Sequence, residues 1–150
     1  MSLNIVLIEP EIPNNTGNIG RLALASGSIL HLVKPFGFKI TDTQLKRAGL
    51  DYWQHITLHI YENTEDFFAI NKGKTMVFLS SHGTKSHWDI PFEDNLFLVF
   101  GKESVGLPKS ILEKYSEEIY KIPLYSKRIR SLNLANAVSV VVYEGLRKLI

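Results

Sequence analysis

Three segments of this 150-residue sequence combine amides, hydroxyls, cations and glycines at spacings that could bind a ligand. The first, residues 13–21, reads PNNTGNIGR and contains three asparagines, two glycines, a threonine and Arg21. We expect it to follow a strand and lead into a helix, where backbone N–H groups and capping side chains are suited to an anion. The alternative is an ordinary capped turn with an arginine on the surface.

The second segment, residues 101–108, reads GKESVGLP and has the G-x-x-x-x-G spacing of a P-loop. Leu107 and Pro108 stand where a P-loop has its lysine and its magnesium-binding hydroxyl, which excludes a nucleoside triphosphate site of that type. A G-x-G-x-x-G fingerprint for dinucleotides is also missing after the first predicted strand. What remains is a glycine turn that lets a ligand approach the backbone, with Glu103 at its rim, or a plain strand-to-helix turn.

The third segment, residues 122–136, reads IPLYSKRIRSLNLAN. Three cations, which include Arg128 and Arg130, precede Ser131 and two asparagines at the start of a predicted helix. Cations, a hydroxyl and amides at a helix start could hold phosphate and ribose groups of a nucleic acid. The alternative is helix capping next to solvated basic residues.

Other reactive residue types narrow the chemistry further. The chain has no cysteine, which excludes thiol nucleophiles, zinc knuckles, iron–sulfur sites and redox C-x-x-C chemistry. His55 and His59 have the i, i+4 spacing of a helical metal pair, but they fall in or beside a predicted strand and H-E-x-x-H is absent. We therefore expect no metal site. Residues 80–85, which include His82, follow a predicted strand and could line the same cleft as the three segments.

The elements that must position these segments alternate between strand and helix. Helical signals occupy residues 16–27, residues 64–70, with Thr64 as a candidate cap, and residues 109–116, where Pro108 suits the first helical position. The sequence predicts an α/β fold with a largely parallel sheet flanked by helices, whose ligand-binding loops converge at the carboxyl ends of the strands. Six short apolar runs rich in β-branched residues predict the strands, namely residues 3–8, 29–34, 56–61, 75–80, 96–100 and 118–122.

The last segment, residues 134–150, favours a strand by its valines but is too long for a typical strand, so we predict a helix. Its apolar positions surround most of the circumference, and one face must be covered by something other than the domain's own sheet. A partner subunit in a two-fold homodimer is the simplest cover.

Composition sets the broader limits. An apolar fraction of 45% with 8 Phe, 6 Tyr and 2 Trp is enough for the core of one domain spanning residues 1–150. The apolar runs are far shorter than a membrane span, and the N-terminal residues lack a basic signal region, so we expect a cytoplasmic protein with no membrane association. Residues 1–120 carry 11 basic and 14 acidic residues, whereas residues 121–150 carry six basic and one acidic, which suggests an anionic partner, or alternatively a solvated basic face.

Taken in order, NNTGNIGR, FGKESVGLP and IPL followed by RSLNLANAV closely resemble the three motifs of the SpoU-type branch of the SPOUT RNA methyltransferases. The opening NIVLIEPEIP, the RAGLDY at residues 47–52 and the ending VVVYE are similar to the small tRNA 2′-O-methyltransferases that act on the wobble nucleotide. The resemblance covers essentially the whole chain.

This resemblance implies a C-terminal trefoil knot, an S-adenosylmethionine site within it, a homodimer, and a tRNA substrate methylated on the ribose of wobble nucleotide 34, cytidine or modified uridine. Ribosomal RNA as substrate, or a non-catalytic RNA-binding homologue, are the alternatives. By motif position, Arg128 and Arg130 would bind the tRNA backbone. The cofactor would contact five residues: Leu79, Gly101, Ile122, Leu124 and Ser131. The family's functional positions match Asn15, Arg21, Glu103, Ser131, Asn133 and Tyr143.

Methyl transfer from a sulfonium to a hydroxyl is an in-line displacement, so aligning oxygen, carbon and sulfur provides much of the catalysis without a metal. The lack of cysteine agrees, because pyrimidine C5 methylation ordinarily needs a cysteine nucleophile. Arg21 corresponds to the family's proposed base, but a guanidinium is a strong base that stays charged in proteins and gives up a proton reluctantly. We therefore expect Arg21 to hold a phosphate and to stabilise the developing alkoxide.

Overall fold

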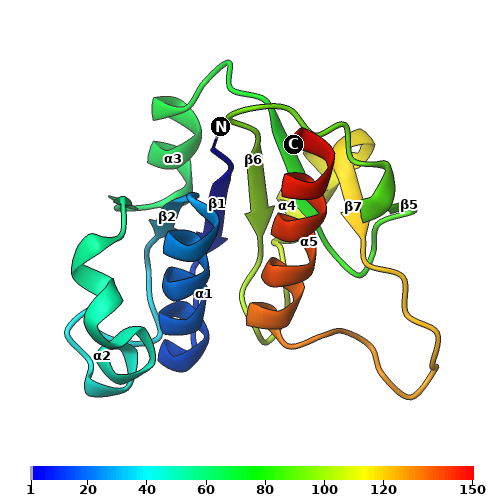
Figure 1. Cartoon of the computed structure of the whole chain (residues 1–150). Helices are drawn as coiled ribbons and strands as arrows, with labels where there is room; N and C mark the ends of the chain where they lie inside the picture. Colours follow the sequence, from blue (N-terminus) through cyan, green and yellow to red (C-terminus); the bar gives the residue numbers. More distant parts are fainter. Residues whose placement is uncertain (1) are drawn as a thin grey trace.

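A computed structural model of the chain describes residues 2–150, in which seven strands form one sheet with helices on both faces (Figure 1). Every strand pair in the sheet is parallel. The strand order is β3-β2-β1-β6-β4-β7-β5. The strands are β1 (Asn4–Ile8), β2 (Ile29–Val33), β3 (Leu58–Tyr61), β4 (Met76–Leu79), β5 (Lys85–Ser86), β6 (Phe97–Phe100) and β7 (Ile119–Lys121).

All six predicted strands are present, and the predicted α/β class with a parallel sheet is confirmed. The seventh strand, β5, was not predicted, because two residues are too few to show periodicity. It pairs only with β7, through Lys85 opposite Tyr120 and Ser86 opposite Lys121. The order reverses between β1 and β6: β2 and β3 extend the sheet to one side of β1, and later strands extend it to the other. In open parallel sheets such a reversal is where ligands bind.

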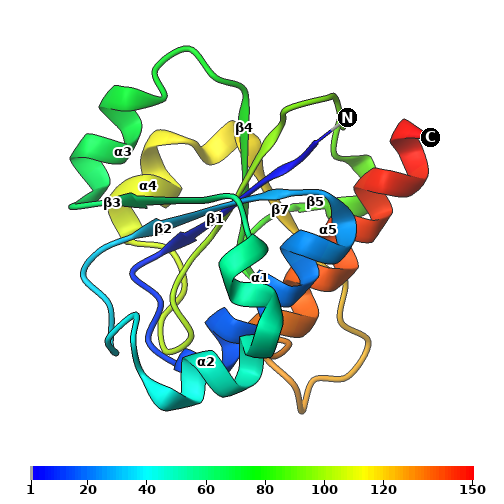
Figure 2. The ribbon, with the colours of Figure 1, turned by 60° about the vertical axis from the view of Figure 1, so that its left-hand side comes forward.

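Helices cover the two faces unequally (Figure 2). On one face, α1 and α5 pack on β1, β2, β4 and β6 around a large apolar core, and α2 packs against the outside of α1. On the other face, α3 and α4 enclose a smaller core that includes Phe67, Phe78 and Val99. The helices are α1 (Pro13–Ser26), α2 (Thr43–Gly49), α3 (Thr64–Ile70), α4 (Lys109–Lys114) and α5 (Leu134–Leu149), with three 3-10 turns η1 (Leu50–His55), η2 (His87–Asp89) and η3 (Ser116–Glu118).

Helix α1 begins at Pro13, three residues before the predicted start. The expected side-chain cap is absent: Ile12 occupies the N-cap position, and Asn15 and Thr16 are buried inside the helix. Proline at the first helical position has its φ already fixed at a helical value, and its missing N–H is one that a helix start would leave unpaired. The amides of this segment are therefore available for contacts outside the helix.

The other helices need smaller corrections. Asn63, rather than Thr64, caps α3, because its side chain accepts a hydrogen bond from the backbone N–H of Asp66 at 2.8 Å. Pro108 is the N-cap of α4 rather than its first residue, and α4 ends at Lys114. Helices α2 and η1 were not predicted. The helix predicted over residues 134–150 is confirmed as α5.

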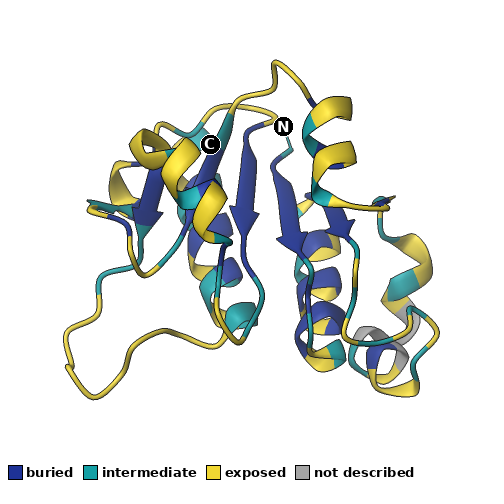
Figure 3. Cartoon of the chain, turned by 180° about the vertical axis from the view of Figure 1, so that it is seen from behind, coloured by how far each residue is buried: buried dark blue, intermediate teal, exposed yellow. Residues whose placement is uncertain are grey.

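The central strands β1, β2, β4 and β6 are almost wholly buried, whereas the chain from β7 to α5 is exposed over residues 124–133 (Figure 3). This exposed segment holds the basic part of the third motif. None of the helices within residues 2–150 combines the length and apolar character that crossing a membrane requires.

Candidate active site

A cavity of about 850 Å³ lies at the carboxyl ends of four neighbouring strands, β1, β6, β4 and β7. All three motifs and the loop after β4 contribute to its wall, so the predicted convergence of the loops is confirmed. Its lining consists of Ile12, Asn15, Leu79, Ser80, Ser81, His82, Phe100, Gly101, Lys102, Glu103, Ser104, Val105, Gly106, Ile122, Leu124, Arg130, Ser131, Leu132, Asn133, Leu134 and Ala137.

Glu103 ties the second motif to the first. Its carboxylate accepts hydrogen bonds from the backbone N–H groups of Glu11 at 2.8 Å and Ile12 at 2.9 Å, and from the Asn15 side chain at 3.2 Å. An ionised carboxylate at the start of α1 also interacts favourably with the positive end of the helix dipole. Glu103 therefore supplies from a distant loop the stabilisation that a local capping side chain would provide.

Glu11 makes the reciprocal contact. Its carboxylate accepts a hydrogen bond from the backbone N–H of Ser104 at 2.8 Å, and hydrogen bonds from the Ser104 hydroxyl and N–H lower the pKa of Glu11. A third link joins Lys102 to Glu9 across 3.2 Å. Glu9 adopts a left-handed backbone conformation, with φ of 53°, at the end of β1. Two carboxylates, each hydrogen-bonded to the backbone of the opposite loop, and one ion pair thus hold the loops after β1 and β6 together.

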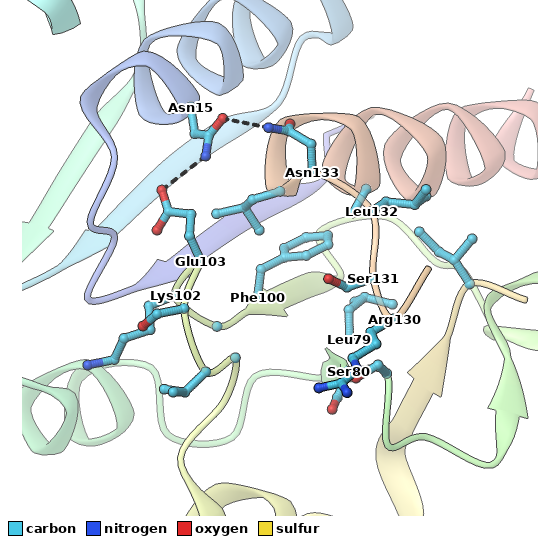
Figure 4. A pocket seen from close by; sticks show the side chains of 18 of the residues that line it. Asn15, Leu79, Ser80, Phe100, Lys102, Glu103, Arg130, Ser131, Leu132 and Asn133 are labelled. Atoms are coloured by element: carbon cyan, nitrogen blue, oxygen red, sulfur yellow. Dashed lines mark hydrogen bonds between the residues drawn. The ribbon is translucent and has the colours of Figure 1, made fainter. Parts of the chain in front are cut away.

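Asn133 ties the third motif to the same cluster. Its side-chain N–H donates to the Asn15 side-chain oxygen at 3.1 Å, and Asn15 in turn donates to Glu103 (Figure 4). The oxygen of Asn133 accepts from the backbone N–H of Asn136 at 3.2 Å and caps α5, so the helix capping that was the alternative for this segment is also present. One chain of hydrogen bonds therefore spans residues that are 118 positions apart in the sequence.

The loop after β6 folds back on itself at two glycines. A Cβ on Gly101 would lie 2.1 Å from the carbonyl carbon of Gly106, and Gly106 has a φ of 72°. The N–H of Gly106 donates to the carbonyl of Lys102 at 2.9 Å and closes the loop. Both glycines are required by backbone geometry, and both line the cavity.

The structure places nine of the residues predicted from the sequence in the cavity wall: Asn15, Leu79, Gly101, Glu103, Ile122, Leu124, Arg130, Ser131 and Asn133. Arg21, Arg128 and Tyr143 are not among the described residues of the wall. Arg21 lies six residues beyond Asn15, about 9 Å along the helix axis and on another face of α1. Tyr143 is 49% exposed on α5, and Arg128 lies in the exposed segment before that helix.

Sequence reasoning missed some residues of the site. Glu11 and Lys102 brace the loops, but a glutamate between a proline and an isoleucine, or a lysine after a glycine, carries no recognisable signal. The loop after β4 was expected as a possible part of the cleft, and residues 80–82 do line it. Across residues 2–150, no group of three or more His, Asp or Glu side chains is arranged to hold a metal ion.

Comparison with known proteins decides the family. A model of the SpoU rRNA methylase family matches residues 2–143. The chain belongs to this SpoU family. The tRNA (cytidine(34)-2′-O)-methyltransferase of Saccharophagus degradans is 45% identical over 149 residues, which are 97% of this chain and 95% of that protein. The enzyme of the same name from Methylovorus glucosotrophus is 44% identical over 146 residues, covering 97% of this chain and 94% of that protein.

Solved structures of SpoU relatives have the same fold. A structure described as giving insights into the 2-OH methylation of C/U34 on tRNA is 41% identical, with a TM-score of 0.93, and the match covers 98% of this chain and 95% of that one. An rRNA methyltransferase from Sinorhizobium meliloti with AdoMet bound is 26% identical, with a TM-score of 0.88, and the match covers 99% of this chain and 57% of that one.

Proposed function

We propose that this protein transfers a methyl group from S-adenosylmethionine to the ribose 2′-hydroxyl of the wobble nucleotide of tRNA, cytidine or uridine 34. The observation that carries the proposal is the convergence of all three motifs on one cavity, joined by the Asn133–Asn15–Glu103 hydrogen bonds. The names of the relatives from Saccharophagus and Methylovorus, which match nearly the full length of this chain, support this nucleotide and this reaction.

The cavity fits the cofactor in size and chemistry. Pockets of about 300–1,000 Å³ hold ligands of this class, and the cavity volume of about 850 Å³ leaves room for a ribose beside the cofactor. Leu79, Ile122 and Leu124 form an apolar wall for the adenine, while Gly101 and Ser131 lie where peptide groups and a hydroxyl can bind polar parts. When bound, S-adenosylmethionine supplies a methyl group activated by its sulfonium.

The polar and charged side chains of the three motifs, together with Tyr143, have separate roles in this proposal. Asn15 and Asn133 orient the sugar, and Glu103 fixes Asn15. Arg21 binds a phosphate next to the reacting ribose and stabilises the negative charge that develops on its oxygen, because a guanidinium donates several hydrogen bonds but does not readily accept a proton. Arg128 and Arg130, exposed next to the cavity, bind the tRNA backbone, and Tyr143 acts in recognition of the wobble nucleotide.

The proposal includes a homodimer. Helix α5 exposes Val140 and Tyr143, and α1 exposes Leu24, although these two helices pack against each other on the same face of the sheet. Arg21 also lies outside the cavity wall of its own chain. A two-fold mate seated on α1 and α5 would cover the apolar side chains and bring Arg21 of the partner subunit toward the cavity. Sedimentation velocity tests the dimer.

We further propose that residues 1–150 form a single methyltransferase domain with a C-terminal trefoil knot, and that the protein acts in the cytoplasm, where tRNA is its substrate. Family membership supports the knot. An experimental density map tests it, because the traced chain, with its ends joined, reduces either to a trefoil or to an unknotted loop.

Mass spectrometry of tRNA tests the function. Unmodified tRNA incubated with the protein and S-adenosylmethionine is expected to gain one methyl group, and nuclease fragments should place it on the ribose of nucleotide 34. If only ribosomal RNA is methylated, ribosomal RNA and not tRNA is the substrate. If the protein binds tRNA without methylating it, the protein is a non-catalytic homologue.

A further inference from the structure

Arg21 has a defined partner on the outside of α1. Its guanidinium carbon, Cζ, lies over the ring of Tyr52, 4.9 Å from the ring centroid. This separation is within the range of about 6 Å over which a cation is attracted to an aromatic face. Both side chains are exposed, and Tyr52 retains 39% of its accessible surface, so the pair lies at the protein surface.

A close contact one residue earlier places Tyr52 there. A Cβ on Gly20 would lie 2.8 Å from both Trp53 Cζ3 and Ile56 Cδ1, so only glycine allows η1 to approach α1 this closely. Trp53 and Ile56 pack against the larger core and anchor η1. Gly20 precedes Arg21 in the chain, and Tyr52 precedes Trp53. The packing of Trp53 on Gly20 therefore also places Tyr52 beside Arg21.

An aromatic partner leaves the arginine free to bind. A carboxylate partner would occupy two N–H donors in a bidentate pair and offset the positive charge. A ring beneath the guanidinium attracts the cation through its face, while the N–H donors lie in the guanidinium plane and can still bind a phosphate or a ribose oxygen. Tyr52 can therefore restrict the Arg21 side chain without using its hydrogen-bonding capacity.

We propose that Tyr52 is a positioning residue for Arg21, holding the guanidinium in the orientation that binds the RNA phosphate at the reacting nucleotide. This inference rests on the proposed function, in which Arg21 contacts the substrate. The ring face matters and the hydroxyl does not, since the structure shows the cation over the ring. Loss of the ring frees the Arg21 side chain, whose rotamer entropy must then be lost when RNA binds.

The test compares Tyr52→Leu and Tyr52→Phe, with Gln54→Leu as a matched control on the same exposed turn. Single-turnover methylation and tRNA affinity are measured, together with S-adenosylmethionine affinity and melting temperature. Tyr52→Leu is expected to weaken tRNA binding and slow transfer by about fivefold, in line with one lost surface cation–π contact, with unchanged cofactor affinity and a melting temperature within about 4 °C of wild type. Tyr52→Phe and Gln54→Leu are expected to remain within about twofold of wild type, because both keep an aromatic ring at position 52.

A double-mutant cycle separates positioning from a general effect on the surface. If Tyr52 acts through Arg21, Tyr52→Leu has no further effect on tRNA affinity once Arg21→Ala is present. Effects that multiply, or a Tyr52→Leu protein equal to wild type beside an impaired Arg21→Ala protein, would overturn the inference. If the wild-type protein transfers no methyl group, the proposed function fails, while the cycle in tRNA affinity still decides whether Tyr52 acts through Arg21.

Discussion

The polar cluster around His31 is closed, whereas the polar cluster around Glu103 opens onto a cavity. His31 is 4% exposed in the middle of β2, and its two ring nitrogens lie 2.8 Å from the Tyr61 hydroxyl and 2.8 Å from the Asn4 side-chain oxygen. Glu103 lies in the loop after β6, Asn15 in the first turn of α1 and Asn133 at the start of α5, and all three line the cavity. The first cluster lies within the sheet, and the second can meet a ligand.

The directions of the hydrogen bonds around His31 follow from its neighbours. Asn4 donates its side-chain N–H to the carbonyl of Asn95 at 3.0 Å, so its oxygen accepts from Nε2–H of His31. Nδ1 of His31 is then unprotonated and accepts from Tyr61, whose oxygen accepts in turn from Asn71 at 3.3 Å. All four side chains are satisfied with a neutral imidazole, and this is the arrangement expected of a polar group that stabilises a core.

The two clusters differ in access: the polar side chains around His31 bond to one another inside the protein, whereas those around Glu103 border a cavity that a ligand can enter. The partners of Glu103 lie 88 to 92 positions earlier, in α1 and in the loop before it, and the cluster faces the cavity. Substitutions in the two clusters should therefore affect different measurements. The four predictions below test this separation, in order of decreasing effect.

Glu103→Ala is expected to lower kcat/KM for tRNA methylation by about 1,000-fold, because two or three charge-assisted hydrogen bonds of about 1.5–3 kcal/mol each are lost at the start of α1. Steady-state kinetics measure the effect. Glu113→Ala removes an exposed carboxylate whose ion pair with Lys109 spans 3.9 Å, and it is the matched control, expected to match wild type. An active Glu103→Ala protein would show that the cluster does not shape the site.

Gly101→Ala is expected to weaken S-adenosylmethionine binding by about 100-fold, because the new Cβ must push the Gly106 backbone away and deform the loop. Calorimetric titration measures this affinity. The control is Gly73→Ala, whose Cβ meets no atom within 4 Å but whose φ of 87° is strained. It should cost about 1 kcal/mol of stability and leave cofactor binding intact. Equal affinities for wild type and Gly101→Ala would contradict the assignment of this loop.

His31→Phe is expected to reduce the free energy of unfolding by about 3 kcal/mol, because the Asn4 oxygen and the Tyr61 hydroxyl lose their buried partner while the volume is nearly kept. Urea denaturation measures the loss, and kcat/KM per folded molecule should stay within about twofold of wild type. A large loss of activity without a loss of stability would remove the distinction between the two clusters.

Mild acid should weaken the His31 cluster. Burial, with a smaller contribution from His59, lowers the pKa of His31 to about 4, while the unfolded chain titrates near its ordinary value of 6.5. Between these values the unfolded state binds more protons than the folded state. The free energy of unfolding therefore decreases as the pH is lowered, by about 2 kcal/mol from pH 7 to pH 5. Burial also lowers the pKa of His87, which adds a loss of the same sign.

Denaturation curves at several pH values measure this dependence, and His31→Phe isolates the contribution of His31. The variant is expected to lose most of the pH dependence between pH 7 and pH 5 and to keep the part that His87 supplies. An unchanged dependence in the variant would show that His31 is not the titrating group.

The sequence predicted best those features that depend on residues close together in the chain. Continuous apolar runs identified six strands, and glycines and amides after those strands identified the loops that meet in the cavity. Contacts between distant segments were not predictable in detail: nothing near Pro13 indicates that Glu103 replaces a local cap, and nothing in η1 indicates that Gly20 brings Tyr52 onto Arg21. The His31 cluster was also missed, because a lone histidine in an apolar run does not reveal its partners.

The most direct test of the central claim is a crystal structure of the protein grown with S-adenosylhomocysteine, the product left after methyl transfer. Ligand density is expected in the cavity between the loops after β4, β6 and β7, with the adenine against Leu79, Ile122 and Leu124 and the Glu103–Asn15–Asn133 hydrogen bonds intact. Ligand bound at another place in the saturated protein, with this cavity empty, would contradict it.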